Sequence, residues 1–380
     1  MPPTIVVYVV STLQRTGPTT QLLNLVKNLD LTRYKPQIVT LSPEPKDSLK
    51  DQFLSHGVDV KVLDLSRMQG AFRANKYVRD VIRQTGAQLV HTQGIRADAM
   101  VSSSAYRHIS RIATLRNYPQ LDYPLTYGRS LGKLMSFVHT RCLKRLDLTV
   151  GVSRPVTENL RKLVPHVTVT TVMNGVDTDV FEPVNEFEKQ QIRNHLGFSS
   201  SATIWLVSGH LSQRKDPITL IEGFKNAFGD DCSQLLILIG AGPLEDAARS
   251  LTQGCGNIRI EGRVSDVRSY LQASDFYVSA SMGEGLPNAA LEAMACGLPV
   301  LISDIEPHHQ LLEMKPGIGV SFETGNAVSL KKGFRTMMDC DIQVMRQSAI
   351  ELTKNELSAR AMAVNYQNLY DELMTLGAGA

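Results

Sequence analysis

Short apolar runs rich in β-branched residues alternate along the chain with longer segments whose apolar positions recur at helical spacing. Each short run predicts a buried strand, and each longer segment predicts a helix that covers one face of a sheet. This alternation is typical of βαβ units with parallel strands, and it recurs in both halves of the chain. We therefore expect an α/β protein with two doubly wound parallel sheets in tandem. The predicted strands are 4–10, 37–41, 58–63, 88–92, 112–115, 148–152, 167–172, 202–208, 234–239, 257–261, 276–279, 300–303 and 319–322.

The junction between the halves is predicted at Asn174-Gly175, where an Asn-Gly turn ends an apolar run. Phe181-Glu182-Pro183 follows it, and a predicted helix over 186–196 restarts the pattern. A chain of 380 residues is long enough for two domains of about 100–200 residues each. We expect domains at 1–175 and 176–358. The last helix, about 359–376, has no strand after it and is expected to pack back onto the first domain.

Composition and charge exclude several classes of protein. With 43% hydrophobic and 20% charged residues, the chain resembles an ordinary globular enzyme rather than a disordered or fibrous protein, and a net charge of +3 does not argue for a nucleic-acid partner. Five cysteines without CxxC spacing cannot form a complete disulfide framework, which fits a reducing compartment. The opening apolar run is far shorter than the roughly 20 residues of a membrane span and lacks signal-peptide features. We expect a cytoplasmic protein.

One stretch, 107–162, is distinctly basic, and it favours an anionic partner. The alternative is that these side chains are ordinary solvated helix faces. Apolar residues interleave with them; they predict the core face of a helix, or else a surface that lies on the anionic cytoplasmic face of an inner membrane. The basic residues are Arg111, Arg116, Arg129, Lys133, Arg141, Lys144, Arg145, Arg154 and Arg161, and the apolar ones are Leu131, Leu134, Met135, Phe137 and Val138.

The most informative segment follows the predicted strand 276–279, because ligands of doubly wound sheets bind beyond the carboxyl ends of strands. It reads Gly283-Glu284-Gly285-Leu286-Pro287-Asn288 and opens a helix that stops at Gly297. The free N–H groups and dipole of that helix start form an anion site, which the glycines let a ligand approach. Glu284 and Glu292 are eight residues apart, on the order of 12 Å along a helix. That spacing suits a nucleotide sugar, with one carboxylate on hexose hydroxyls and the other on ribose hydroxyls.

Three further loops follow strands of the second half. In Gly209-His210-Leu211-Ser212-Gln213-Arg214-Lys215-Asp216-Pro217, two basic residues precede a helix start, where the helix dipole disfavours them unless an anion binds. Gly240-Ala241-Gly242-Pro243-Leu244 joins a strand to a helix through glycines. Gly262-Arg263-Val264 offers backbone groups that could read the edge of a nucleobase.

These four loops, in this order, resemble those of the retaining glycosyltransferases of family 4, which have the GT-B fold of two facing Rossmann-like domains. Glu284 and Glu292 match the E-x7-E motif of that family, with the glycine, apolar residue and proline between them in place. The linker from Asn174 to Pro183 also fits. The resemblance covers nearly the whole chain and is strongest over 171–304.

The resemblance implies roles for the donor-side residues. Lys215 and a neighbouring basic residue would hold the donor diphosphate, Glu292 the ribose, and Glu284 with the backbone N–H groups of 285–288 the sugar. The family usually has Arg where this chain has His210, so Arg214 is the alternative second phosphate ligand. The donor-binding set is Gly17, Gly209, His210, Gly240, Gly242, Pro243, Leu244, Arg263, Val264, Gly285, Leu286, Pro287, Asn288 and Glu292.

In the first half, Gly17 matches the glycine-rich loop of the family. The family often has His at the position of Arg116. Since Arg does not deprotonate in proteins, Arg116 is expected to orient an acceptor oxygen or to stabilise phosphate charge rather than act as a base. His91, at the end of a predicted strand, is a further candidate. The catalytic set is therefore Glu284, Lys215, Arg214, Arg116 and His91.

The resemblance predicts transfer of a hexose or N-acetylhexosamine, with retention, from a nucleotide diphosphate sugar. A UDP-sugar is the expected donor, and a glycan or lipid-diphosphate-linked saccharide of a bacterial surface polysaccharide is the expected acceptor. The alternatives are a GT-B-like sugar-nucleotide epimerase and a sugar-nucleotide-binding scaffold without catalysis. A dinucleotide oxidoreductase is disfavoured because 11–17 is not a G-x-G-x-x-G turn.

No metal or other cofactor is expected, the nucleotide sugar being a substrate. Two D-x-D sequences, Asp177-Thr178-Asp179 and Asp339-Cys340-Asp341, resemble the metal motif of another glycosyltransferase fold. Neither follows a predicted strand near the donor loops. We therefore expect activity that does not depend on a metal ion.

Overall fold

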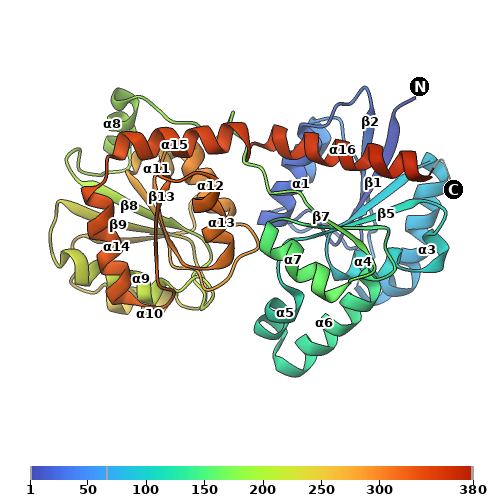
Figure 1. The fold of residues 1–380 in the computed structure, drawn as a ribbon, viewed down its shortest axis with the longest axis horizontal. Helices are drawn as coiled ribbons and strands as arrows, with labels where there is room; N and C mark the ends of the chain where they lie inside the picture. The colour runs from blue at the N-terminus through green and yellow to red at the C-terminus, as the bar shows by residue number, and fades with distance from the viewer. Residues whose placement is uncertain (1, 66, 378–380) are drawn as a thin grey trace. The chain divides into compact units, whose positions relative to one another are not determined.

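The computed structural model describes residues 2–65 and 67–377, and the chain forms two compact units. Unit 1 comprises the chain up to Gly175 together with the segment from Ala359 onward, and unit 2 is Val176–Ser358. Figure 1 shows that each unit is a central sheet with helices on both faces. The predicted fold class, two doubly wound Rossmann-like units, is confirmed.

The sheet of unit 1 has seven parallel strands in the order β3-β2-β1-β4-β5-β6-β7. Between β1 and β4 the direction of winding reverses, and ligands bind at such a switch point in doubly wound sheets. The strands are β1 Thr4–Val10, β2 Tyr34–Thr40, β3 Asp59–Val62, β4 Leu89–Thr92, β5 Ser110–Leu115, β6 Leu148–Gly151 and β7 Thr168–Thr171.

The last helix, α16, belongs to unit 1 and lies beside α1 (Figure 1). Met362, Ala363, Tyr366 and Tyr370 of α16 are buried in the core that also holds the inward side chains of β1. The helices of unit 1 are α1 Gly17–Lys27, α2 Lys50–Ser55, α3 Arg67–Thr85, α4 Ile95–Val101, α5 Pro119–Tyr127, α6 Arg129–Leu143, α7 Arg154–Leu163 and α16 Ala359–Gly377.

The sheet of unit 2 has six parallel strands in the order β10-β9-β8-β11-β12-β13, so its switch point lies between β8 and β11. Its strands are β8 Thr203–Ser208, β9 Gln234–Ile239, β10 Ile258–Gly262, β11 Phe276–Ser279, β12 Val300–Ser303 and β13 Gly319–Phe322. Its helices are α8 Glu186–His195, α9 Pro217–Phe228, α10 Glu245–Leu251, α11 Val267–Ala273, α12 Asn288–Ala295, α13 Glu306–Met314, α14 Ala327–Asp339 and α15 Ile342–Asn355.

All thirteen predicted strands are present, and the largest difference is at β2, which begins three residues before the predicted start at Gln37. The sequence did not predict this extension because of Pro36: proline has no N–H to donate and is usually found at the start or edge of a strand. Here β3 pairs with β2 only from Gln37 onward, so the missing N–H interrupts no ladder. Among the described residues, no helix is both long enough and apolar enough to cross a bilayer.

Candidate active site

The basic loop of unit 2 connects β8 to α9 at the switch point of the sheet. Its last residue, Asp216, has a left-handed backbone with φ 45°, which is unusual for a residue with a side chain. The Asp216 carboxylate compensates by accepting a hydrogen bond from the Thr219 N–H, which caps α9. This turn fixes the backbone directly after Lys215.

Two glycines in the loop after β9 let that loop approach the basic loop closely. Gly240, after β9, has φ +133°, and a Cβ there would lie 1.8 Å from the backbone oxygen of Gly209. A Cβ on Gly242 would lie 2.3 Å from the backbone oxygen of Leu211. The two glycines of the 240–244 loop are therefore needed for backbone packing, which holds the Lys215 loop in place.

Glu284 lies between two cations. Its Oε1 is 2.5 Å from Nζ of Lys215, and its Oε2 is 3.1 Å from a guanidinium nitrogen of Arg214. Oγ of Ser281 also donates to Oε1, at 2.9 Å. Burial by itself raises the pKa of the Glu284 carboxyl, but Lys215 and Arg214 outweigh it and lower that pKa to about 2. The carboxylate is thus charged and holds both basic side chains at the carboxyl end of the sheet.

Glu292 lies on α12, the helix that begins after the Glu284 loop. It makes no ion pair and no side-chain hydrogen bond with the residues that the structure describes. Burial raises the pKa of the Glu292 carboxyl to about 7, although Lys215 opposes that shift. A partly buried carboxyl without a partner among the described residues is able to accept hydrogen bonds from a ligand, and its charge changes near neutral pH.

The remaining predicted donor residues fall into two groups. Gly285, Leu286 and Pro287 are buried at the start of α12, where no side chain caps the helix and its positive dipole end favours an anion. His210, Pro243 and Arg263 are exposed at the ends of their strands, with Gly209, Leu244, Val264 and Asn288 partly covered. Gly209, His210 and Lys215 line one small crevice beyond β8 and β11.

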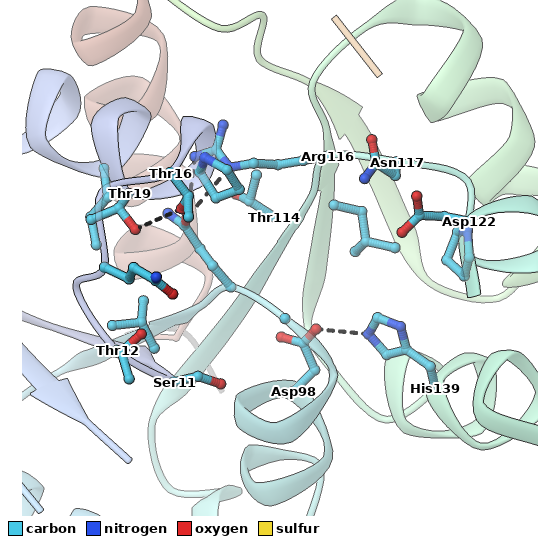
Figure 2. A pocket seen from close by; sticks show the side chains of 18 of the residues that line it. Ser11, Thr12, Thr16, Thr19, Asp98, Thr114, Arg116, Asn117, Asp122 and His139 are labelled. Atoms are coloured by element: carbon cyan, nitrogen blue, oxygen red, sulfur yellow. Dashed lines mark hydrogen bonds and ion pairs between the residues drawn. The ribbon is translucent and has the colours of Figure 1, made fainter. Parts of the chain in front are cut away.

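Unit 1 contains a larger pocket, with a volume of about 320 Å³, at the carboxyl ends of β1, β4 and β5 (Figure 2). Its lining is rich in hydroxyl and amide groups, which suit a polar ligand. The pocket lies beside the start of α1 at Gly17, where Thr16, Pro18 and Thr19 contribute to its wall. The polar residues labelled in Figure 2 include Ser11, Thr12, Thr16, Thr19, Thr114 and Asn117.

Arg116 lines this pocket at the end of β5. Its guanidinium donates to the Asn174 side-chain oxygen at 2.6 Å and to that of Gln93 at 3.2 Å, and it has no carboxylate partner among the described residues. Burial lowers the pKa of Arg116 to about 10. The side chain remains a cation at neutral pH, so a partly buried positive charge lines the pocket with only neutral partners among the described residues.

A second buried polar cluster in this pocket was not found from the sequence. Nε2 of His139, on α6, is 2.7 Å from a carboxylate oxygen of Asp98, on α4, and the two side chains point toward each other (Figure 2). Nδ1 of His139 is 2.8 Å from the Tyr123 hydroxyl, on α5, and Thr92 Oγ donates to Asp98. All three of Asp98, Tyr123 and His139 line the pocket.

His91 is in a different position from the one that a catalytic role requires. It is fully buried in β4, outside the lining of the pocket, and both ring nitrogens are occupied. Nδ1 is 2.8 Å from the Tyr370 hydroxyl of α16, and Nε2 is 2.7 Å from Thr114 Oγ. Burial lowers the pKa of His91 to about 3, so the ring is neutral. We therefore correct the expectation for His91: it joins the sheet to α16.

Comparison with known proteins decides the family. Residues 188–356 match the family model described as glycosyl transferases group 1, and residues 15–180 match the model of glycosyltransferase family 4. The chain belongs to glycosyltransferase family 4.

Two curated relatives of this family 4 chain are bacterial proteins that are named as glycosyltransferases. A putative teichuronic acid biosynthesis glycosyltransferase, TuaC, from Bacillus subtilis (strain 168) is 30% identical over 228 residues, or 58% of this chain and 54% of the relative. The UDP-Gal:α-D-GlcNAc-diphosphoundecaprenol α-1,3-galactosyltransferase of Escherichia coli is 28% identical over 153 residues, or 38% of this chain and 39% of the relative. The chain thus spans only about two fifths to one half of the length of these relatives.

Solved structures share the fold of this family 4 chain over its whole length. A glycosyltransferase from Rickettsia africae has a TM-score of 0.79 and 18% identity, covering 98% of this chain and 99% of that one. Alr3699/HepE from Anabaena, in complex with UDP-glucose, has a TM-score of 0.80 and 14% identity, covering 97% and 99%. At such identities the likeness shows the fold, which is GT-B.

Proposed function

We propose that this family 4 chain is a retaining glycosyltransferase that moves a hexose or N-acetylhexosamine from a nucleotide diphosphate sugar to a glycan or lipid-linked saccharide. The observation that carries the proposal is Glu284, held between Lys215 and Arg214 at the carboxyl ends of β8 and β11. A UDP-sugar is the proposed donor, and bacterial surface polysaccharide synthesis the proposed context. The UDP-glucose complex of HepE and the name of the Escherichia coli relative support both choices.

In this proposal, the donor diphosphate takes the place of the Glu284 carboxylate beside the two cations. Lys215 and Arg214 already converge on one anion, and the dipole of α12, whose start no side chain caps, adds positive potential. Arg214 is therefore our choice for the second phosphate ligand, since His210 is exposed and has no contact that orients it among the described residues. Glu284 then binds sugar hydroxyls, and the unpartnered Glu292 binds the ribose hydroxyls.

The proposed reaction keeps the configuration of the anomeric carbon. An acceptor hydroxyl attacks that carbon from the face that the diphosphate leaves, the bond to the phosphate oxygen breaks, and that oxygen takes the hydroxyl proton. The protein then acts chiefly by stabilising the charge that develops on the diphosphate, through Lys215, Arg214 and the start of α12. In this scheme no protein base is required, which is compatible with an arginine at position 116.

The pocket of unit 1 is the proposed acceptor site. Arg116 supplies a partly buried cation whose hydrogen-bond partners are neutral, so a phosphate or carboxylate of the acceptor would be its counter-charge. The hydroxyl-rich lining would bind the saccharide. Together these features suit a sugar linked to a diphosphate lipid.

The test is product analysis with UDP-galactose, UDP-glucose and UDP-N-acetylglucosamine, using GlcNAc-diphosphoundecaprenol as the acceptor probe. The expected product is an acceptor extended by one α-linked sugar, identified by mass and by the NMR coupling of its anomeric proton. A β-linked product would contradict retention. Isomerised or free sugar formed without an acceptor would favour the epimerase, and binding without turnover would favour the scaffold.

We also propose that unit 1 works at the anionic cytoplasmic face of a membrane, through the helical hairpin of α5 and α6 (Figure 1). The apolar stripe of this hairpin predicts a core face, but most of its residues are exposed instead. Leu125 is 74% exposed and Phe137 is 61% exposed. Exposed basic side chains interleave with them, which is the composition of a surface that binds anionic lipid. The exposed apolar residues are Leu121, Leu125, Tyr127, Leu131, Leu134, Phe137 and Val138, and the exposed basic ones Arg129, Lys133, Arg141, Lys144 and Arg145.

Flotation with vesicles tests this location. The protein is expected to float with phosphatidylglycerol vesicles and to remain unbound with phosphatidylcholine alone. Phe137→Ser should weaken the binding severalfold, while Phe187→Ser, at a residue 71% exposed on α8 between two glutamates, should not. Equal binding to both vesicle types, or equal loss in the two variants, would contradict the proposal.

A further inference from the structure

The Asp98, His139 and Tyr123 cluster has one arrangement of protons when the imidazole is neutral. When Asp98 is a carboxylate that accepts from Thr92 Oγ and from His139 Nε2, the ring proton is on Nε2. Nδ1 must then accept, and the Tyr123 hydroxyl donates its single proton to it. Every proton of the chain is directed toward Asp98.

This arrangement determines which hydrogen bonds a ligand can make with the acceptor wall, the side of the pocket formed by Asp98, His139 and Tyr123. With its proton committed to His139, the Tyr123 oxygen presents only lone pairs, and Asp98 is likewise an acceptor. The cluster is well held, because Asp98 and His139 are almost completely buried and come from α4 and α6. Tyr123 is on α5 and lines the pocket between these helices. The acceptor wall therefore accepts hydrogen bonds from a ligand and donates none.

We propose that Tyr123, positioned by His139 and Asp98, is a specificity-determining residue that accepts a hydrogen bond from one hydroxyl of the saccharide acceptor. The proposal rests on the proposed function, since it takes the unit 1 pocket as the acceptor site. With Arg116 also in the lining, the pocket has a wall for hydroxyl groups and a separate cation for an anionic group. A ligand with both groups is thereby oriented, because an anion is repelled by the Asp98 wall and attracted by Arg116.

The experiment measures binding of methyl glycosides in the absence of any donor. The probes are methyl α-glucoside, α-galactoside and N-acetyl-α-glucosaminide, each with its monodeoxy and monodeoxyfluoro analogues, titrated by NMR. Fluorine keeps a weak acceptor at the position of the hydroxyl but cannot donate. At one ring position we expect about tenfold weaker binding for both analogues, as for a lost hydrogen bond near the upper end of its usual range.

Tyr123→Phe and the ligand analogues together form a double-mutant cycle between protein and ligand. Tyr123→Phe should bind the parent glycoside about tenfold more weakly and should no longer distinguish it from the two analogues. Tyr77→Phe, on α3 and outside the pocket lining, removes a hydroxyl that donates to the Val62 oxygen; it is the matched control and should bind as wild type. Thermal melting of both variants monitors folding, and the comparison of analogues on the wild type stands even if Tyr123→Phe is unstable.

Three results would overturn the inference. They are a deoxyfluoro analogue that binds as well as its parent, full discrimination retained by Tyr123→Phe, and no binding of any glycoside at millimolar concentration. Because the binding assay uses no nucleotide sugar, these outcomes are independent of the product analysis that tests the transferase activity itself.

Discussion

Two glutamates eight residues apart have opposite electrostatic surroundings. Glu284 has a pKa lowered to about 2 by two cations, so its contribution to stability is present above about pH 4.5 and is lost as the pH falls toward 2. Glu292 has a pKa raised to about 7 by burial. Folding favours its protonated form, so its effect on stability is most favourable below about pH 4.5 and diminishes as the pH rises through 7.

The raised pKa of Glu292 predicts pH-dependent donor binding. If ribose hydroxyls donate to its carboxylate, the donor binds the charged form, and affinity rises with pH up to about 7 and then levels off. Below that pH, affinity should fall by up to about tenfold per unit. Calorimetric titration with UDP-glucose from pH 5.5 to 8.5 measures it, because this diphosphate has no ionisation of its own in that range. In Glu292→Gln the dependence should vanish; an unchanged profile would assign it to another group.

Lys215 is expected to contribute mainly to turnover. Lys215→Ala removes a charge that stabilises the leaving diphosphate, and kcat should fall by about 10²–10³. The control is Lys225→Ala, which removes an exposed lysine that donates to the backbone of Leu251, away from the donor loops. Steady-state kinetics with saturating acceptor provide the comparison, and near-wild-type turnover of Lys215→Ala would refute the role.

At the scale of elements, the proposed donor site depends on loops that contact each other through their backbones. The loop after β9 lies against the loop after β8 at Gly240 and Gly209, and the second of these loops contains Lys215. In unit 1, the corresponding support comes from a distant element: α16 holds His91 and Thr114 through Tyr370 and Tyr366. These contacts place the ends of the central strands.

The glycine contact predicts a specific loss of stability. Gly240→Ala places a Cβ 1.8 Å from the Gly209 oxygen at φ +133°, so the two loops must separate, at a cost of about 3 kcal/mol or more in the free energy of unfolding. Gly256→Ala, with no atom within 4 Å of its Cβ, is the control and should change little. Urea denaturation of both variants measures the difference. A Gly240→Ala protein as stable as wild type would show that the loops are not packed in this way.

At the scale of the whole molecule, two Rossmann-like units are joined by two chain crossings, at 175–176 and 358–359. Val176 and Ser358 form a parallel β-bridge, and the Val176 N–H donates to the Leu357 oxygen at 2.8 Å, so the two crossings lie side by side. Unit 2 carries the cationic donor loops, and unit 1 carries the larger polar pocket.

The two basic side chains in unit 2 predict sugar transfer that does not depend on a divalent cation. In the proposed function, Lys215 and Arg214, which converge on one carboxylate, supply the positive charge for the diphosphate. Of the two D-x-D sequences, one has Asp341 capping α15, and the other lies in the segment between β7 and α8. Initial rates with 5 mM EDTA should equal those with 5 mM Mg²⁺. A rate that drops with EDTA and returns with Mg²⁺ would contradict the prediction.

The sequence by itself determined the sheet architecture and which residues lie in the loops at the carboxyl ends of the strands of unit 2. Buried parallel strands are continuous apolar runs, and the residues that follow them must lie at one edge of the sheet, so local pattern is sufficient. The positions of Glu284, Glu292, Lys215 and Gly240 follow from such adjacency.

Only the tertiary structure decided what His91 contacts, which residues form the acceptor wall, and which side of α6 is exposed. His91 is structural because Tyr370, 279 residues later, folds back against it. Asp98, Tyr123 and His139 come from three helices, and no local spacing brings them together. Leu134 and Phe137 have the pattern of a core stripe, yet α5 packs against α6 at Gly132 and leaves them exposed. A pattern shows that a side chain is apolar or ionisable; packing by distant elements decides whether it is covered and what it contacts.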